Sequence, residues 1–541
     1  MFADIPSDVA GYFKPEMPLG PTKGENIKSS AAAAFLLRLE NAAFAGIATR
    51  ASVLIGRRGA GKSVLLRSFT NSYEIASHVE AYLHEADIRR LIRSQNEFTQ
   101  KYDIVLTLDK PDEATSVVKE IVQEGLFTPE HAARIWEERL WTHVLRALVL
   151  DKKLWPRLQP QRRQLLGLLD KTGLFDRRHQ PDLAALIKAA QEEVSTSSLV
   201  DFAKDCVHDH DIQILAIIDS MEEYDVQNPA MVRAIGGLLQ LVGSLTSPAN
   251  GSVHIKISLP SEIYPLIAES SNIGKYYINS ELIRWQPVEL MRILAHRYLT
   301  GLHFLNYPAF NDLWIKYNKS LFKDRDRLRA FWDECFGSHL TNEAGHPESA
   351  ILFILRHTQL LPRQLINFVQ ALIKRSFDST GSYERLDPTL LADRELITNA
   401  ADYIQKEVAF GYKYVYPKTV DVWRMILPRC DVITSYGELQ SRYTNSSVRG
   451  LGHEYCMAFH NFIRAMVEMG VFGIVVDDHS SDRYIKAAFE YNRGTEIALD
   501  EGTKLAMHPV FSARHMTDPA KRAAPGRAIL PIGSFDGLED S

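Results

Sequence analysis

Three glycines, Gly56, Gly59 and Gly61, followed directly by Lys62 and Ser63, form the stretch with the clearest chemistry, "GRRGAGKS". Glycine loses more conformational entropy on folding than other residues, so clustered glycines indicate a backbone that bends tightly or approaches another group closely. The spacing fits G-x-x-x-x-G-K-[ST], in which backbone N–H groups surround a phosphate. Lys62 would reach the β- and γ-phosphates, and Ser63 would bind Mg²⁺ through its hydroxyl. A glycine-rich turn without a ligand is the alternative.

A phosphate-binding loop also needs an acid close to the metal, presented from a neighbouring strand. Asp219 follows the apolar run Ile214–Ile218 and is the candidate for this second Mg²⁺ ligand. Hydrolysis further requires a group that orients the attacking water. Glu222 and Glu223 are the next carboxylates in the chain, and we expect one of them, Glu222 first, to take this role.

The elements around these residues indicate an α/β protein with a parallel sheet. Strands are expected at 52–55, 102–109, 211–225 and 252–264, separated by segments of helical periodicity. The run that begins at 211 is continuously apolar before its acids, as is typical of a parallel strand buried on both faces. The glycine-rich loop lies between the first strand and a helix from about Lys62, which is the context that its motif requires.

Changes in composition divide the 541 residues into five parts. We expect an N-terminal arm, a P-loop core with a helical insert near 110–200, an all-α lid, a winged-helix domain and a flexible tail, at residues 1–30, 31–283, 284–410, 411–515 and 516–541. The winged helix is indicated by three helical segments followed by the strand-like runs "VFGIVV" and "RYIKAAFEY". The tail is rich in Ala, Pro and Gly, which favours a loose segment.

Composition and charge exclude several classes of protein. The chain is 45% hydrophobic with a formal net charge of −5, which is ordinary for a globular protein and gives no overall attraction to nucleic acid. Its four cysteines include no CxxC pair, which is typical of free thiols in a reducing compartment. No apolar run is long enough to span a bilayer, and the N-terminus has no signal-peptide pattern. We therefore expect a cytoplasmic protein with no membrane segment.

Taken together, these features resemble the origin-recognition-like and STAND branches of the AAA+ ATPases, especially bacterial P-loop ATPases with a C-terminal winged helix. The resemblance covers roughly residues 30–515 and is carried by "GRRGAGKS", "IIDSMEEY", "LPSEIY", the lid start Trp285–Leu290, "LLPRQLINF" and "FEYN…MHPVF". It implies a switch that binds and hydrolyses ATP with Mg²⁺. It also implies a protein partner or effector, in a homo-oligomer or a hetero-complex, and by analogy a role in defence against phage.

The resemblance further implies contacts to the nucleotide outside the loop. Ser258 ends a strand at the place of a polar sensor for the γ-phosphate, and Arg363 in "LLPRQLINF" would point at the nucleotide from the lid. Arg284, just before the lid, is the candidate for an arginine finger. The nucleotide-binding set within the loop and its helix is completed by Arg58, Ala60 and Val64.

Two positions depart from the pattern of the family. Ser220 stands where many relatives carry an acid, which implies slow turnover and leaves a non-hydrolysing, ATP-bound scaffold as an alternative. Pro260 stands where some relatives carry an arginine, which removes one candidate for a contact to the nucleotide or to a neighbouring subunit.

The charge of the expected winged helix bears on its ligand. Between Lys413 and Phe511 there are eleven Lys or Arg and twelve Asp or Glu, and the expected wing contains Asp477, Asp478 and Asp482. DNA affinity depends largely on neutralising phosphates, so this surface favours protein docking or regulation of the lid. A DNA-binding initiator or transposition-type regulator remains the alternative.

Overall fold

A computed structural model gives the structure of the protein and describes residues 7–23, 27, 52–67, 102–107, 117–119, 121–123, 128–150, 154, 157–158, 196–219, 226–245, 252–264, 267, 280–317, 324–337, 339–383, 386–416, 423, 425–444, 458–493, 497–513 and 526–534. The chain divides into two compact units. Ala43–Gly56 and Leu91–Leu282 form the first, called the sheet unit here. Met1–Ala42, Arg57–Arg90 and Ile283–Ser541 form the second, called the C-terminal unit.

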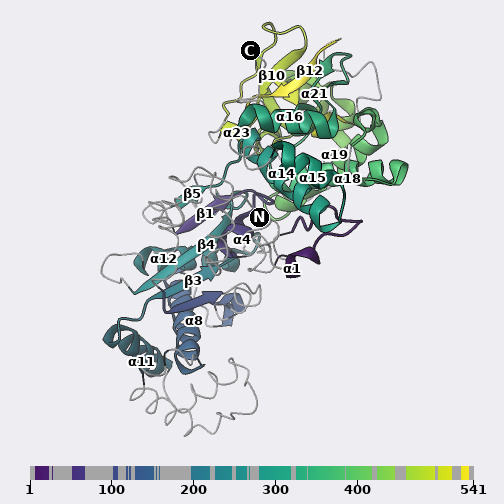
Figure 1. The fold of residues 1–541 in the computed structure, drawn as a ribbon. Helices are drawn as coiled ribbons and strands as arrows, with labels where there is room; N and C mark the ends of the chain where they lie inside the picture. Colours follow the sequence, from purple (N-terminus) through teal and green to yellow (C-terminus); the bar gives the residue numbers. More distant parts are fainter. Residues whose placement is uncertain are drawn as a thin grey trace. The chain divides into compact units, whose positions relative to one another are not determined.

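The sheet unit is built on five strands, which are β1 (Val53–Gly56), β2 (Ile104–Thr107), β3 (Ile214–Ile218), β4 (Val253–Pro260) and β5 (Ser280–Leu282) (Figure 1). Their order is β2-β3-β4-β1-β5, and every pair is parallel. This confirms the predicted α/β class with a parallel sheet. All five residues of β3 are buried, as predicted for a strand covered on both faces, although the strand is shorter than the run 211–225.

Three helices of the sheet unit have described bounds: α8 (Pro129–Leu150), α11 (Thr196–Asp209) and α12 (Pro229–Leu245). The helical insert that the sequence predicts near 110–200 contains α8. The Trp136 indole donates a hydrogen bond of 2.8 Å to the Ala234 carbonyl, which joins α8 to α12. At the same contact Gly237 lies against Ala132, and a Cβ on Gly237 would come within 2.5 Å of the Ala132 Cβ.

The C-terminal unit begins with α1 (Ser7–Ala10) and a segment that packs on α14 (Pro287–Phe304). The Arg297 guanidinium donates to the carbonyls of Leu19 (3.2 Å) and Pro21 (2.8 Å), and burial lowers the pKa of Arg297 to about 9. The Pro18 carbonyl lies so close to Gly301 that a Cβ there would be only 2.1 Å away. Residues 9–21 of the predicted arm are therefore held against the helical region.

Residues 285–411 are largely helical, as the pattern predicts. After α14 follow α15 (Ala309–Tyr317), α16 (Arg325–Phe336), α17 (Ala350–Arg356), α18 (Pro362–Thr380), the 3-10 helix η11 (Pro388–Ala392) and α19 (Arg394–Gly411). Trp332 of α16 is completely buried, and its indole donates to the Met291 carbonyl of α14 at 3.3 Å. The buried Trp332 side chain therefore joins α16 to α14.

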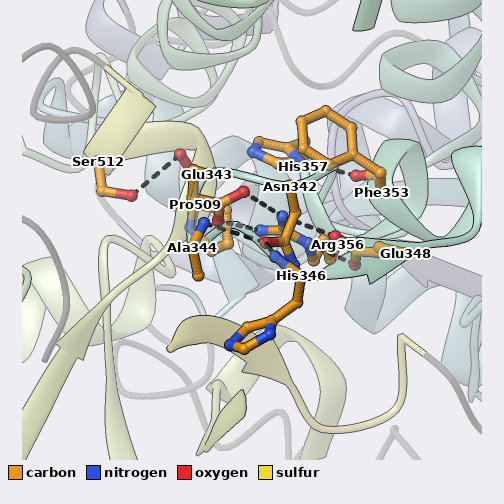
Figure 2. A network of polar contacts seen from close by, with 10 residues as sticks. All are labelled: Asn342, Glu343, Ala344, His346, Glu348, Phe353, Arg356, His357, Pro509 and Ser512. Atoms are coloured by element: carbon orange, nitrogen blue, oxygen red, sulfur yellow. Dashed lines mark hydrogen bonds and ion pairs between the residues drawn. The ribbon is translucent and has the colours of Figure 1, made fainter. Parts of the chain in front are cut away.

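The prediction of an all-α lid is wrong at one place, because β6 (Leu340–Thr341) and β7 (Pro347–Glu348) form an antiparallel hairpin. The turn is made by Asn342, whose side-chain oxygen accepts from the backbone N–H groups of Ala344 and His346, both at 3.0 Å (Figure 2). Gly345 completes it with a φ of 86°. Asn and Gly at these positions reverse the chain within a helical region.

The C-terminal sheet contains β8 (Ile433–Ser435), β9 (Phe472–Asp477), β10 (Tyr484–Ala488), β11 (Lys504–Met507) and β12 (Ala528–Pro531), in the order β12-β10-β9-β11-β8. Its helices are η12 (Leu427–Arg429), α21 (Tyr436–Thr444), α22 (Phe459–Glu468), α23 (Glu490–Arg493) and α24 (Pro509–Ser512). The expected short hairpin is thus part of a five-stranded sheet.

The predicted flexible tail needs a correction as well. Residues 528–531 form β12, which pairs in parallel with β10, and Ala528, Ile529 and Leu530 are buried. The apolar run "AILP" finds its partner strand more than 40 residues earlier, which the local Ala, Pro and Gly composition does not reveal. Among the described helices of the chain, none combines the length and hydropathy needed to cross a membrane.

Candidate functional site

The glycine-rich loop starts where β1 ends. In the sheet unit Gly56 is the last residue of β1, and its carbonyl accepts a hydrogen bond of 3.1 Å from the Ser261 N–H. In the C-terminal unit the chain continues through Arg57 and enters α4 (Lys62–Arg67). Gly59 and Gly61 have φ values of 86° and 95°, a region that L side chains rarely adopt. Both positions therefore require glycine.

The loop closes on itself around the Arg57 carbonyl. This oxygen accepts from the Ala60 N–H at 3.0 Å and from the Lys62 ammonium at 3.3 Å. Lys62 is only 4% exposed, so its charge is held inside the turn. Ser63 and Val64 follow in the first turn of α4, Ser63 partly exposed and Val64 buried. The loop thus has the donors that an anion needs: backbone N–H groups, an ammonium and a hydroxyl.

Two residues far away in the sequence fix the loop within the C-terminal unit. The Trp285 indole donates to the Ala60 carbonyl at 2.8 Å. Arg363, in the first turn of α18, donates its backbone N–H to the Gly59 carbonyl at 3.4 Å. A Cβ on Gly59 would lie 3.1 Å from the Arg363 Cβ. The structure therefore places Arg363 beside the loop, while its predicted contact to the nucleotide stays a prediction. It adds Trp285, which sequence reasoning did not assign to the site.

The Arg363 guanidinium contacts a backbone carbonyl and a carboxylate. Its Nε donates to the Thr22 carbonyl at 3.3 Å, and its Nη1 lies 3.7 Å from Glu407 Oε1. Burial raises the pKa of Glu407, while the nearby Arg363 and Arg58 guanidinium groups oppose that rise. The Arg58 guanidinium also covers the Phe410 ring, 3.9 Å from its centroid. Glu407 and Phe410, both on α19, were not predicted from the sequence because nothing local marks them.

Arg57 connects the loop to the C-terminal elements. Its Nη2 donates to the Met469 carbonyl at 3.3 Å, at the end of α22, where a cation is favourable. Its guanidinium carbon lies 6.0 Å from the centroid of Tyr412 and 5.6 Å from that of Tyr491. Gln359 donates to the same Met469 carbonyl at 2.9 Å. The helical region and the C-terminal elements therefore meet at one carbonyl beside the loop.

Asp219 and Ser258 meet in the sheet unit. Asp219 directly follows β3, Ser258 lies on β4, and both are almost completely buried. The Ser258 hydroxyl donates to the Asp219 carboxylate. Burial also lowers the pKa of Lys256, two residues earlier on β4, to about 7. Asp219 stands at the carboxyl edge of the strands, where parallel sheets bind ligands.

Several predicted residues are not placed by the structure or lie apart from these contacts. Ser220, Glu222 and Glu223 lie outside the described residues. Arg284 is exposed and precedes Trp285, and Pro260 ends β4 in register with Gly56. The roles proposed for the two glutamates and for Arg284 therefore remain predictions.

No protein-family model matches the sequence, and the comparison with curated proteins finds no match. Among solved structures, the chain is similar to the ORC2 protein of Aeropyrum pernix in ADPNP–ADP complexes, with 10% identity, 86% of each chain covered and a TM-score of 0.37. It is also similar to Cdc6p from Pyrobaculum aerophilum, with 10% identity, 87% of this chain and 88% of the other covered, and a TM-score of 0.29. Neither likeness carries an argument about function at these values.

Proposed function

We propose that the chain binds ATP with Mg²⁺ through the loop Gly56–Ser63, hydrolyses it, and works as a nucleotide-controlled switch. One observation carries the proposal. The G-x-x-x-x-G-K-S sequence follows a strand of a parallel sheet and enters a helix, with Gly59 and Gly61 at positive φ and Lys62 folded over the turn. This is the local geometry with which backbone N–H groups and an ammonium hold a polyphosphate.

In this proposal each residue has its own role in binding the nucleotide or the metal. Lys62 neutralises the β- and γ-phosphates, and Ser63 supplies a hydroxyl ligand to Mg²⁺. Asp219 is the proposed acidic partner of the metal, with its carboxylate fixed by the Ser258 hydroxyl. Glu222 is the proposed residue that orients the attacking water. The metal, when bound, supplies positive charge to the phosphates; the chain supplies position and hydrogen bonds.

The switch part of the proposal is supported by the contacts around the loop. Arg57, within the loop, is bonded to Met469, and Arg363, beside the loop, contacts Thr22 and Glu407. A phosphate would compete for these cations, so its arrival would alter bonds to distant elements. A protein partner and a role in defence against phage rest on the sequence resemblance alone.

Lys62→Ala tests the proposal. We expect ATP affinity, measured by calorimetry with Mg²⁺, to fall by at least about tenfold, because a charge-assisted hydrogen bond to phosphate is lost. Lys374→Ala, at an exposed position of α18, is the matched control and should bind ATP like the unmodified chain. Equal affinity in both variants would refute the proposal. If ATP binds but is recovered intact after long incubation, the binding part of the proposal stands, the hydrolysis part fails, and the non-hydrolysing scaffold is favoured.

A further inference from the structure

A cavity of about 380 Å³ lies in the C-terminal unit between the β6–β7 turn, the start of α19 and the C-terminal strand β12. Its volume is at the lower end of the roughly 300–1,000 Å³ that is typical of small-molecule sites. One part of the wall is apolar and is formed by Phe353, Leu391, Ile397, Val432, Pro509 and Ile529. An apolar wall of this kind suits the hydrocarbon or aromatic body of a ligand.

Two arginines, Arg394 and Arg527, line the same cavity from different elements. Arg394 is the first residue of α19, and its guanidinium has neither an ion pair nor a hydrogen bond among the described residues. The acids at this helix N-terminus, the N-cap Asp393 and Glu395 in the first turn, do not line the cavity. The Arg527 guanidinium donates to the backbone carbonyl of Asp478 and pairs with no carboxylate in the described part of the chain.

Glu343 is the acidic residue among those that line the cavity, and its carboxylate is paired with Arg356. Figure 2 shows its carboxylate turned to Arg356, whose Nη1 and Nη2 donate to the two oxygens, the former at 2.7 Å. On another edge of the same guanidinium, Arg356 Nε donates to the Glu348 carboxylate at 2.8 Å. Burial acts against the charge of Glu343, but the pairing with Arg356 lowers the pKa of Glu343 to about 2. The one carboxylate among the residues that line the cavity is therefore paired with Arg356 and with neither Arg394 nor Arg527.

The rim of the cavity is open and preformed. Gly345 and Gly526 both line it, and a Cβ built on either residue would meet nothing within 4 Å. A hydrogen bond of 2.5 Å between His346 Nε2 and the Gly526 carbonyl joins the β6–β7 turn to the start of the last strand. A ligand can approach the backbone at these glycines without first displacing a side chain.

We propose that this cavity binds a small organic anion with an apolar body. The anionic group, a carboxylate, sulfonate or phosphate, lies between Arg394 and Arg527, and the body packs on the apolar wall. Guanidinium groups suit such anions because they donate in a planar fork. The inference does not depend on ATP binding, since it uses none of the residues of the glycine-rich loop.

The test uses two probes of nearly the same shape with the full chain. 1-Anilinonaphthalene-8-sulfonate carries an anion on an aromatic body, and N-phenyl-1-naphthylamine lacks the sulfonate. In the double variant Arg394→Gln and Arg527→Gln, the affinity for the sulfonate should fall by about tenfold or more, since charged hydrogen bonds are lost. The affinity for the uncharged probe should change less than about twofold. Ala392→Trp, at an exposed position of the rim, should weaken both probes.

Arg325→Gln is the matched control. Arg325 is exposed and is the first residue of α16 after the N-cap Asp324, just as Arg394 follows the N-cap Asp393, but it does not line the cavity. It should leave both affinities unchanged. If the double variant is unstable, Arg394→Gln alone repeats the test at an exposed position. Unchanged sulfonate affinity in the arginine variants, or an equal loss for both probes, would overturn the proposal.

Discussion

At Gly59 two separate requirements select the same residue. Its φ of 86° disfavours any side chain, and the Arg363 Cβ lies only 3.1 Å from the place where a Cβ would stand. The first requirement belongs to the glycine-rich motif and follows from the sequence. The second depends on a helix that starts about 300 residues later and could not be predicted from spacing. The motif alone therefore underestimates how strongly this glycine is required.

Gly59→Ala and Gly345→Ala separate the two requirements, because both glycines have a φ of 86° but Gly345 has nothing within 4 Å of its Cβ position. We expect Gly345→Ala to cost about 1–2 kcal/mol of the free energy of unfolding through its backbone alone. Gly59→Ala should cost more and should also weaken ATP binding, which Gly345→Ala should leave intact. Urea unfolding and ATP calorimetry measure both effects. Equal losses of stability would show that the Arg363 contact is unimportant.

Among the elements, α8 and α12 show how close packing depends on one small residue. A Cβ on Gly237 would come within 2.5 Å of the Ala132 Cβ and within 2.6 Å of the Ala133 backbone nitrogen. Because the second atom belongs to a helix backbone, the clash cannot be relieved by rotating a side chain. The helices would have to move apart, and the hydrogen bond from Trp136 to Ala234 would lengthen.

Gly237→Ala should therefore destabilise the sheet unit, although alanine in a helix is favoured over glycine by about 1 kcal/mol. Overpacking costs about 1–3 kcal/mol, so we expect a net loss in urea unfolding. Gly437→Ala is the helical control: it lies in α21 with nothing within 4 Å of its Cβ position, so only the gain in helix propensity applies. A Gly237→Ala variant more stable than the unmodified chain would contradict the packing argument.

Elements with a strong local pattern were predicted correctly, and those defined by distant partners were not. The helix α8 and the buried strand β3 follow from apolar periodicity within their own residues. The strand β12 gains its stability by pairing with β10, and its composition resembles a tail. The β6–β7 hairpin was missed because Asn342 acts as a turn residue inside a helical stretch. Local sequence does not encode which strand another strand will meet.

At the scale of the whole molecule, one of the boundaries between the two compact units falls between Gly56 and Arg57, within the residues 31–283 that the sequence assigns to a P-loop core. The reason lies in the contacts of the loop: Ala60 is bonded to Trp285, Gly59 to Arg363 and Arg57 to Met469. The loop follows a strand of one unit in sequence and has these partners in the other.

Two buried histidines make the stability of the C-terminal unit depend on pH. Burial, followed by the charge of Arg356, lowers the pKa of His357 to about 3, and burial also lowers the pKa of His508 well below its ordinary value. In the unfolded chain both would titrate near pH 6.5. Above that pH neither state binds the proton and the stability is fully present. As the pH falls from 6.5 toward 3, only the unfolded chain takes up protons, so stability is lost.

His357→Asn tests this linkage, because an asparagine amide can still donate to the Phe353 carbonyl that His357 Nδ1 contacts at 2.7 Å, but it does not titrate. The free energy of unfolding of the C-terminal unit, measured in urea from pH 8 to pH 4.5, should fall less steeply in the variant, by about 1.4 kcal/mol per pH unit below pH 6. The difference at pH 8 reports the cost of altered packing and contains no proton linkage. Since the two contributions separate in this way, parallel curves over the whole range would mean that His357 takes up its proton in the folded chain, against the burial that the structure gives it.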